Sequence, residues 1–142
     1  MPKMLLVHPY YGLMKLWIQL LREKGFEVVF ADNLADTLKR LKAEKFDLLV
    51  IEPLLGPGQE GFPLDEKFSN YPGLEAMRQI RANTFASAGN PKSLPIIVWT
   101  MMSAGSGEGY ALALSFKPER IIDAIRSVGS LAQVCHDLLN KK

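Results

Sequence analysis

Cysteine is almost absent from this chain of 142 residues, which holds only Cys135. A single thiol cannot form a disulfide within the chain, so a disulfide framework is excluded and a reducing compartment fits best. Long hydrophobic runs are missing too. The apolar run of residues 4–7 ends at His8 and Pro9, too soon for a signal peptide or a membrane span. We therefore expect a cytoplasmic protein without a membrane partner.

Charge of one sign is not in excess either. The 17 Lys and Arg residues are offset by 15 Asp and Glu residues, which leaves a formal net charge of +2. Nucleic-acid binding usually needs a concentrated basic face. The densest basic stretch, residues 39–42, is interrupted by Leu41 and followed by Glu44. We expect it to be the solvated side of a helix, and we expect no nucleic-acid partner.

The length suits one domain, residues 1–142, in which strand and helix patterns alternate. Short apolar runs predict strands at residues 3–8, 27–30, 47–52, 94–100 and 110–116. Periodic patterns and their capping residues predict helices at 13–24, from 32 or 33 to about 41, at 72–81 and from 118 to about 140. Such alternation predicts an α/β fold, an open five-stranded parallel sheet with helices on both faces.

Two connections in this pattern have unusual lengths. The segment Pro53–Tyr71 carries three of the nine prolines and three glycines, and it predicts a loop longer than a compact domain normally needs. Residues 101–109 separate the last two predicted strands and hold three glycines. They leave room for at most one turn of a fourth helix, so we expect that helix to be reduced or absent.

Two predicted strands end on polar residues: Asp47–Glu52 runs through apolar residues to a carboxylate, and Pro95–Thr100 ends on a hydroxyl. Helical segments follow at Pro72–Arg81 and Pro118–Ile125. In this order the segments resemble the receiver domain of two-component response regulators, over nearly the full length of the chain. The resemblance implies a flavodoxin-like sheet of strand order 2-1-3-4-5, and protein partners in signalling.

Several residues depart from the receiver pattern. His8 and Pro9 stand where receivers carry an acidic pair for a divalent ion, and neither offers the carboxylate oxygens that magnesium prefers. Glu52 replaces the phospho-accepting aspartate, and only Thr100 matches. Leu114 falls where the family lysine is expected, and Lys117 fills that place only after a slip of three residues. The resemblance is therefore to a degenerate pseudo-receiver that takes no phosphate, metal or other cofactor.

Catalytic groups are sparse. A nucleophile oriented by a base is not evident, and we expect His8 to be structural and the protein not to be an enzyme. The glycine-bearing segments 56–58 and 104–107 do not lead straight into a helix, as a phosphate-binding loop would. Cys135 lies in an apolar row and is better explained as a small hydrophobic residue than as a reactive thiol.

Two binding modes remain open. In the first, the side chains at the strand ends line a small-molecule pocket formed by His8, Tyr10, Tyr11, Glu52 and Thr100. The alternative is ordinary packing of these aromatic and polar groups. In the second, the first helix contacts a protein partner or a second copy of the chain through Leu13, Met14, Trp17, Ile18 and Leu21.

The second mode rests on the width of the apolar arc of that helix. At the helical period the arc spans about 200°, twice what a surface helix needs to cover its own core. Large exposed apolar patches tend to mark interfaces. The alternative is that the long loop Pro53–Tyr71 covers the excess. We favour a protein-contact module, with a small-molecule sensor as the second hypothesis.

Overall fold

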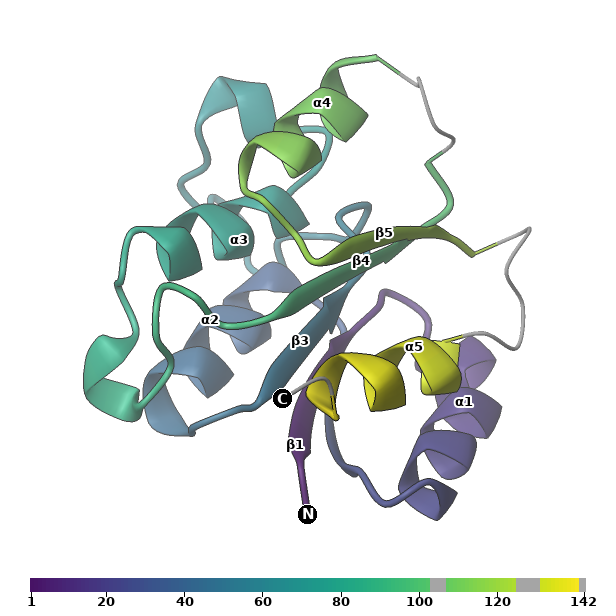
Figure 1. The fold of residues 1–142 in the computed structure, drawn as a ribbon. Coiled ribbons are helices and arrows are strands. Elements are labelled where there is room, and N and C mark those ends of the chain that lie inside the picture. Colours follow the sequence, from purple (N-terminus) through teal and green to yellow (C-terminus); the bar gives the residue numbers. More distant parts are fainter. Residues whose placement is uncertain (103–106, 125–130, 141–142) are drawn as a thin grey trace.

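The computed structural model describes residues 1–102, 107–124 and 131–140. One parallel sheet has the strand order β2-β1-β3-β4-β5, as predicted. Its strands are β1 (Lys3–Val7), β2 (Glu27–Ala31), β3 (Leu48–Ile51), β4 (Ile96–Thr100) and β5 (Arg120–Asp123). Figure 1 shows the sheet running through the middle of the molecule, with helices packed on both sides.

The helices divide between the two faces of the sheet. Helices α1 (Tyr11–Glu23) and α5 (Leu131–Leu139) cover one face, and α2 (Leu34–Ala43), α3 (Gly73–Arg81) and α4 (Glu108–Ser115) cover the other (Figure 1). Each face of the sheet carries its own apolar core, and successive side chains of β3 point into one core and then the other. All four residues of β3 are fully buried. Burial on both faces explains why this strand is a continuous apolar run. None of the described helices is long and apolar enough to cross a membrane.

The last third of the chain differs from the prediction. Residues 110–116, predicted as the fifth strand, belong mostly to helix α4, and the fifth strand is Arg120–Asp123, where a helix was predicted from Pro118. Alanine and leucine, which fill the first segment, are strong helix formers, whereas the β-branched Ile121 and Ile122 suit a strand. The fourth helix is thus present with eight residues. Of the predicted closing helix, residues 125–130 lie outside the described part of the chain.

The long loop Pro53–Tyr71 is present as predicted, with one short 3-10 turn at Glu66–Phe68. Its first half is fixed to α2, since the carbonyls of Gly56 and Pro57 accept hydrogen bonds of 3.0 Å from the first two amides of that helix. Gly58 has a φ of +81°, and a Cβ there would lie 2.2 Å from the Asn33 side chain. Only glycine fits this turn without strain.

The apolar side chains of the loop pack on the α2–α3–α4 face. Phe68 is fully buried and Leu55 nearly so, while Phe62, Leu64 and Tyr71 pack against the same cluster. Helix α1 lies on the opposite face of the sheet. The loop therefore does not cover α1, and the alternative explanation for its wide apolar arc is excluded.

Arg81, at the end of α3, connects four backbone carbonyls that precede β4 and β5. Its guanidinium donates to the oxygens of Phe116 and Lys92 at 2.8 Å, of Leu94 at 2.7 Å and of Lys117 at 3.1 Å. These carbonyls belong to irregular chain, where helix or sheet partners are missing. One side chain thus satisfies the backbone at the amino-terminal edge of two strands.

Replacing Arg81 by alanine should lower the free energy of unfolding by about 3 kcal/mol, because four carbonyls lose a charged donor and two of these hydrogen bonds are partly buried. Urea denaturation measures this change. Arg40→Ala is the control, since Arg40 only forms surface ion pairs with Asp36 and Glu44 and should contribute less than about 1 kcal/mol. Equal losses in the two variants would show that Arg81 is no more than a surface residue.

Candidate functional site

His8, Glu52 and Thr100 meet at the carboxyl edge of the sheet, as the sequence predicts. His8 and Glu52 directly follow β1 and β3, and Thr100 ends β4. These three strands are adjacent and in register. All three side chains are buried, with exposed fractions of 7%, 3% and 0%. In open α/β sheets this edge is where ligands bind and chemistry occurs.

The Glu52 carboxylate is bonded entirely within the protein. Its Oε2 accepts a short hydrogen bond of 2.5 Å from the Thr100 hydroxyl and a longer one of 3.4 Å from the Leu54 amide. Its Oε1 accepts from the Met101 amide at 2.9 Å. The Thr100 oxygen in turn accepts from the Met102 amide at 3.0 Å. Each carboxylate oxygen therefore has at least one donor from the protein. These donors come from β4, from the loop that follows β4 and from the loop that follows β3.

Burial and hydrogen bonding act on Glu52 in opposite directions. Burial disfavours the charged carboxylate and raises the pKa of Glu52, while the bonds from Thr100, Met101 and Leu54 lower it by a smaller amount. The net effect is a raised pKa. A carboxyl group that binds its proton more tightly than usual is typical of a functional site, although structural networks produce the same effect.

His8 takes the place of the first acidic residue of receivers, and its ring is held by local contacts. Its Nδ1 accepts a hydrogen bond of 3.1 Å from the Tyr10 amide. The Nδ1 atom must be unprotonated to do so, and burial lowers the pKa of His8 in agreement with a neutral ring. This histidine thus supports the turn into α1, which agrees with the prediction of a structural role.

The two candidates for the receiver lysine both lie away from this edge. Leu114 is on α4, with 53% of its surface exposed. Lys117 precedes β5, next to Glu119, whose amide bonds to the carbonyl of Ile96 at the first residue of β4. Lys117 is therefore at the opposite, amino-terminal edge, so the slip of three residues that would bring it to the place of the family lysine does not occur.

The residue that does end β5 at the site is Asp123, which pairs in register with Thr100. It is not among the predicted site residues, because the sequence pattern predicts a helix from 118 to about 140. A correct strand assignment would have found it, since the last residue of β5 must lie beside the last residue of β4 in a parallel sheet. An acid thus occupies the strand end where the receiver resemblance leads one to expect a base.

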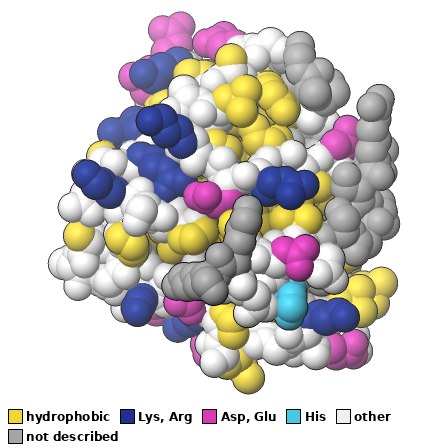
Figure 2. Space-filling model, viewed as in Figure 1, with side chains coloured by type: hydrophobic (Ala, Val, Ile, Leu, Met, Phe, Trp, Pro, Cys, Tyr) yellow, Lys and Arg dark blue, Asp and Glu magenta, His cyan; other side chains and the backbone are white. Residues whose placement is uncertain are grey.

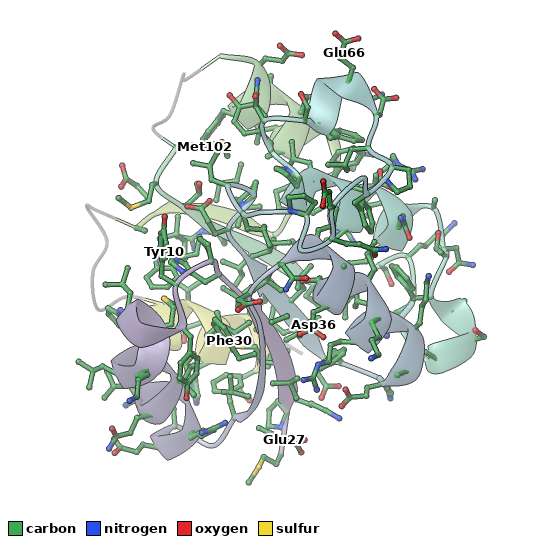
Figure 3. All side chains as sticks on the ribbon, turned by 180° about the vertical axis from the view of Figure 1, so that it is seen from behind. Tyr10, Glu27, Phe30, Asp36, Glu66 and Met102 are labelled. Carbon is green, nitrogen blue, oxygen red and sulfur yellow. The ribbon has the colours of Figure 1, made fainter. Side chains whose placement is uncertain are left out.

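The aromatic residues of the predicted pocket separate in the structure. Tyr10 is 66% exposed at the rim, at the same end of the sheet as Met102 (Figure 3). Tyr11 instead packs edge-on against Phe30 of β2, with ring centroids 5.1 Å apart. Glu52 and Thr100 offer almost no surface to a ligand. The five residues therefore do not line one pocket, although Pro9 and Tyr10 do flank the site.

Trp99 connects the site to α1. Its ring lies 6.2 Å from that of His8 and 5.5 Å from that of Trp17, and it is 94% buried, as ordinary core packing predicts. Its indole Nε1 has no hydrogen-bond partner within the described residues. Cys135 lies in the same apolar cluster, and burial raises the pKa of its thiol to about 12. This cysteine is an unreactive core residue, as predicted.

The glycine segment 56–58 is not a phosphate-binding loop. The carbonyls of Gly56 and Pro57 point to the amides of Leu34 and Ala35, so the loop presents acceptors and occupies the donors that an anion would need. The other segment, 104–107, lies mostly outside the described residues.

The predicted interface residues of α1 divide into two groups. Met14, Ile18 and Leu21 are buried in the core and cannot contact a partner, which corrects the prediction for them. Trp17 is partly buried, and Leu13 is 66% exposed. The structure adds Leu16 and Leu20, with exposed fractions of 63% and 37%. We call Leu13, Leu16 and Leu20 the α1 ridge; their spacing of three and four residues places them on one stripe.

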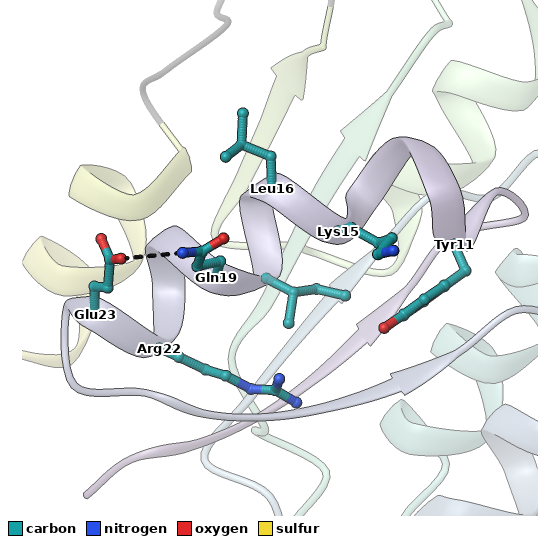
Figure 4. Close-up of a pocket in the computed structure, with 7 residues that line it drawn as sticks. Tyr11, Lys15, Leu16, Gln19, Arg22 and Glu23 are labelled. Carbon is teal, nitrogen blue, oxygen red and sulfur yellow. Dashed lines mark hydrogen bonds between the residues drawn. The ribbon is translucent and has the colours of Figure 1, made fainter.

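The flank of α1 that faces β2 has a different character. It forms a shallow hollow of about 640 Å³, whose lining includes Tyr11, Lys15 and Arg22 together with Leu16 of the ridge (Figure 4). The Arg22 guanidinium donates to the Val28 carbonyl at 3.2 Å. Arg22 thus covers part of the open edge of β2, and Tyr11 is the exposed aromatic residue of α1 on this flank.

Replacing Glu52 by glutamine should remove one source of pH dependence in stability. A raised pKa means that the folded state binds the Glu52 proton more tightly, so this stabilisation is present below pH 4.5 and is lost as the pH rises through the raised value. Relative to the variant, the wild type should become less stable over that window. Urea denaturation at a series of pH values measures the difference in the free energy of unfolding between the two proteins. A difference that does not change with pH would contradict a raised pKa of Glu52.

Replacing His8 by asparagine should have the opposite effect on the dependence of stability on pH. The side-chain oxygen of the asparagine can still accept the hydrogen bond from the backbone N–H of Tyr10. The lowered pKa means that the stability due to neutral His8 is complete above pH 6.5 and is lost as the pH falls through the folded-state value. The wild type should therefore lose stability relative to the variant on acidification. Parallel profiles for both proteins would show that His8 is not the titrating group.

Comparison with known proteins agrees with this geometry at the level of the fold. No protein-family model matches the sequence, and no curated protein matches it. Among solved structures, the non-phosphorylated HemR receiver domain from Leptospira biflexa aligns with a TM-score of 0.73 and 16% identity, over 99% of this chain and 95% of that one.

Two further structures give the same result. A DNA-binding response regulator of the LuxR family from Staphylococcus aureus aligns with a TM-score of 0.74 at 16% identity, over 99% of this chain and 100% of that chain. A signal receiver domain of a two-component histidine kinase from Clostridium thermocellum aligns with a TM-score of 0.70 at 17% identity, over 98% of each chain. The chain therefore has the fold of response regulator receiver domains.

Proposed function

We propose that this chain is a receiver-like regulatory module that acts through protein contacts and is not switched by phosphorylation. The bonding of Glu52 is the observation that carries the proposal. Both carboxylate oxygens accept hydrogen bonds from inside the protein, and 3% of the residue is exposed. A phosphoryl donor would have to displace the Thr100 hydroxyl and the Met101 amide before it could reach the acid.

The groups around Glu52 support the same conclusion. In place of the acidic pair of receivers stands His8, held as an acceptor by the Tyr10 amide, followed by Pro9. The end of β5 carries Asp123 beside Thr100, where a lysine would be needed to balance a phosphoryl group. Magnesium prefers several hard oxygen ligands. A neutral histidine and a fully bonded glutamate are a poor set for it.

Glu52 also suggests which state the module adopts. The extra methylene of glutamate, compared with aspartate, lets the carboxylate reach the Thr100 hydroxyl directly. It brings a charge of about −1 to that position, against about −1.5 to −2 for a phosphoryl group at pH 7. On this proposal the threonine is held permanently by an internal acid, and the module stays in one state.

The α1 ridge is the surface that we assign to the protein contact. Five of the nine large hydrophobic residues exposed in the described chain come from α1 or its N-cap: Tyr10, Tyr11, Leu13, Leu16 and Leu20. Figure 2 shows hydrophobic side chains at the surface on the side of the molecule where α1 lies next to α5. Contiguous exposed apolar surface of this kind tends to mark an interface. We do not assign a small-molecule function, because the five residues predicted for a pocket at the strand ends do not line one cavity.

Incubation with acetyl phosphate and magnesium should leave both the wild type and the Glu52→Asp variant unlabelled. Restoring the aspartate alone supplies neither the acidic pair nor the lysine of receivers. Intact-protein mass spectrometry measures the added phosphoryl group, with a phosphorylatable receiver domain as the positive control. Labelling of Glu52→Asp would show that a working metal site has been retained.

Replacing Leu16 by glutamate should abolish the partner contact of the ridge without unfolding the protein, because Leu16 is 63% exposed. Quantitative affinity purification from native cells would measure binding of a protein partner. Analytical ultracentrifugation would measure association with a second copy of the chain. Gln19→Glu, an exposed position of the same helix outside the ridge, is the charge-matched control. Identical behaviour of all three proteins in both measurements would refute the ridge as a contact surface.

A further inference from the structure

The long loop builds a groove that lies apart from the strand ends and from the α1 ridge. Its walls are α2, α3 and the tip of the loop, and it encloses about 480 Å³. Leu38 and the partly buried Phe62 give it an apolar floor, and Lys39 and Lys42 stand on one side. We propose that this groove binds an acidic peptide segment of a partner protein.

The groove is a fixed feature because the loop that forms it is anchored at both ends. On one side, the carbonyls of Gly56 and Pro57 hold the loop to the first turn of α2. On the other, Phe68 is fully buried among the side chains of the α2–α3–α4 face. Figure 3 shows the loop region that carries Glu66 on the same side of the sheet as α2, which carries Asp36. The binding surface is therefore largely preformed, which lowers the entropic cost of association.

The charges of the groove are unbalanced in favour of a negative ligand. Lys39 and Lys42 are both exposed and have neither an ion pair nor a side-chain hydrogen bond with any described residue. Arg40, which lies between them in sequence, is by contrast paired with Asp36 and Glu44. Residues three apart on a helix have side chains about 5–6 Å from each other at Cβ. The two ammonium groups can thus act on one short acidic segment.

The only carboxylate in the groove wall is already neutralised. Glu75 accepts two hydrogen bonds of 2.7 Å from the Arg78 guanidinium and one of 2.7 Å from the Gln79 amide. The bond with Arg78 is the main cause that lowers the pKa of Glu75. Glu75 is also buried, with 8% of its surface exposed. It therefore offers little repulsion to an incoming acid. Asp65 lies close enough to act on Glu75 and Arg78 but does not line the groove.

The shape of the groove favours a segment of a larger molecule. Pockets for small ligands usually enclose most of the ligand surface, whereas this groove is open along α2, and both lysines are exposed. Its combination of an apolar floor with two cations fits acidic residues next to an apolar anchor. The inference rests on the proposed function only in taking the partner to be a protein.

Fluorescence anisotropy with a short labelled peptide that alternates glutamate with phenylalanine tests the groove. The wild-type chain should bind this peptide, and the double variant Lys39→Glu, Lys42→Glu should bind it at least about fivefold more weakly. The control Lys15→Glu, Lys24→Glu changes the net charge equally on α1 and its C-cap and should leave binding unchanged. A peptide with glutamine in place of glutamate should bind as weakly as the first double variant does.

Three results would overturn the inference: no binding to the wild type, equal weakening in both double variants, or equal binding of the glutamine peptide. Leu16→Glu separates this inference from the proposed function, because it should leave peptide binding intact while it disrupts the α1 ridge. A wild-type chain that keeps its ridge contacts but does not bind the peptide would refute the groove alone.

Discussion

The hydrogen bond between the Thr100 hydroxyl and the Glu52 carboxylate is the interaction on which the site depends. It joins the ends of β3 and β4 at the edge of a parallel sheet where ligands and chemistry are normally found. A carboxylate so deeply buried must be hydrogen-bonded or protonated, because an isolated charge would cost too much. The Met101 amide and the Thr100 hydroxyl meet this requirement. The chain thereby fills the centre of its own site, and the surfaces left for binding lie elsewhere.

Those surfaces are on opposite faces of the sheet, and the long loop explains why. The loop adds Phe68, Leu55 and other apolar groups to the α2–α3–α4 core and shapes the groove beside Lys39 and Lys42. It adds nothing to the α1–α5 face, where the α1 ridge remains uncovered by the described chain. The long loop therefore forms part of the groove beside α2 and leaves the α1 ridge exposed.

The sheet as far as Thr100 could be predicted from the sequence, because continuous apolar strands such as Leu48–Ile51 have no other stable placement. The prediction was wrong after Tyr110. There two short apolar segments follow each other, and both were assigned by their apolar pattern without weighing the helix-forming alanine and leucine of the first against the β-branched Ile121 and Ile122 of the second. That error concealed Asp123 and placed Lys117 at the wrong edge. For α1, periodicity showed that the apolar arc is too wide, but the orientation of the helix on the sheet decides that Ile18 is buried and Leu16 exposed.

The central claim is that the strand-end site is closed to phosphoryl chemistry because Glu52 occupies it. The most direct test is a titration of the isotopically labelled protein with magnesium and beryllofluoride, an analogue of the phosphoryl group, followed by the backbone amide resonances of Met101 and Met102. Both amides donate to atoms of the Glu52–Thr100 pair. The account predicts that their resonances do not move. A saturable, magnesium-dependent shift at these two amides would show that the site still accepts a phosphoryl group, and would contradict it.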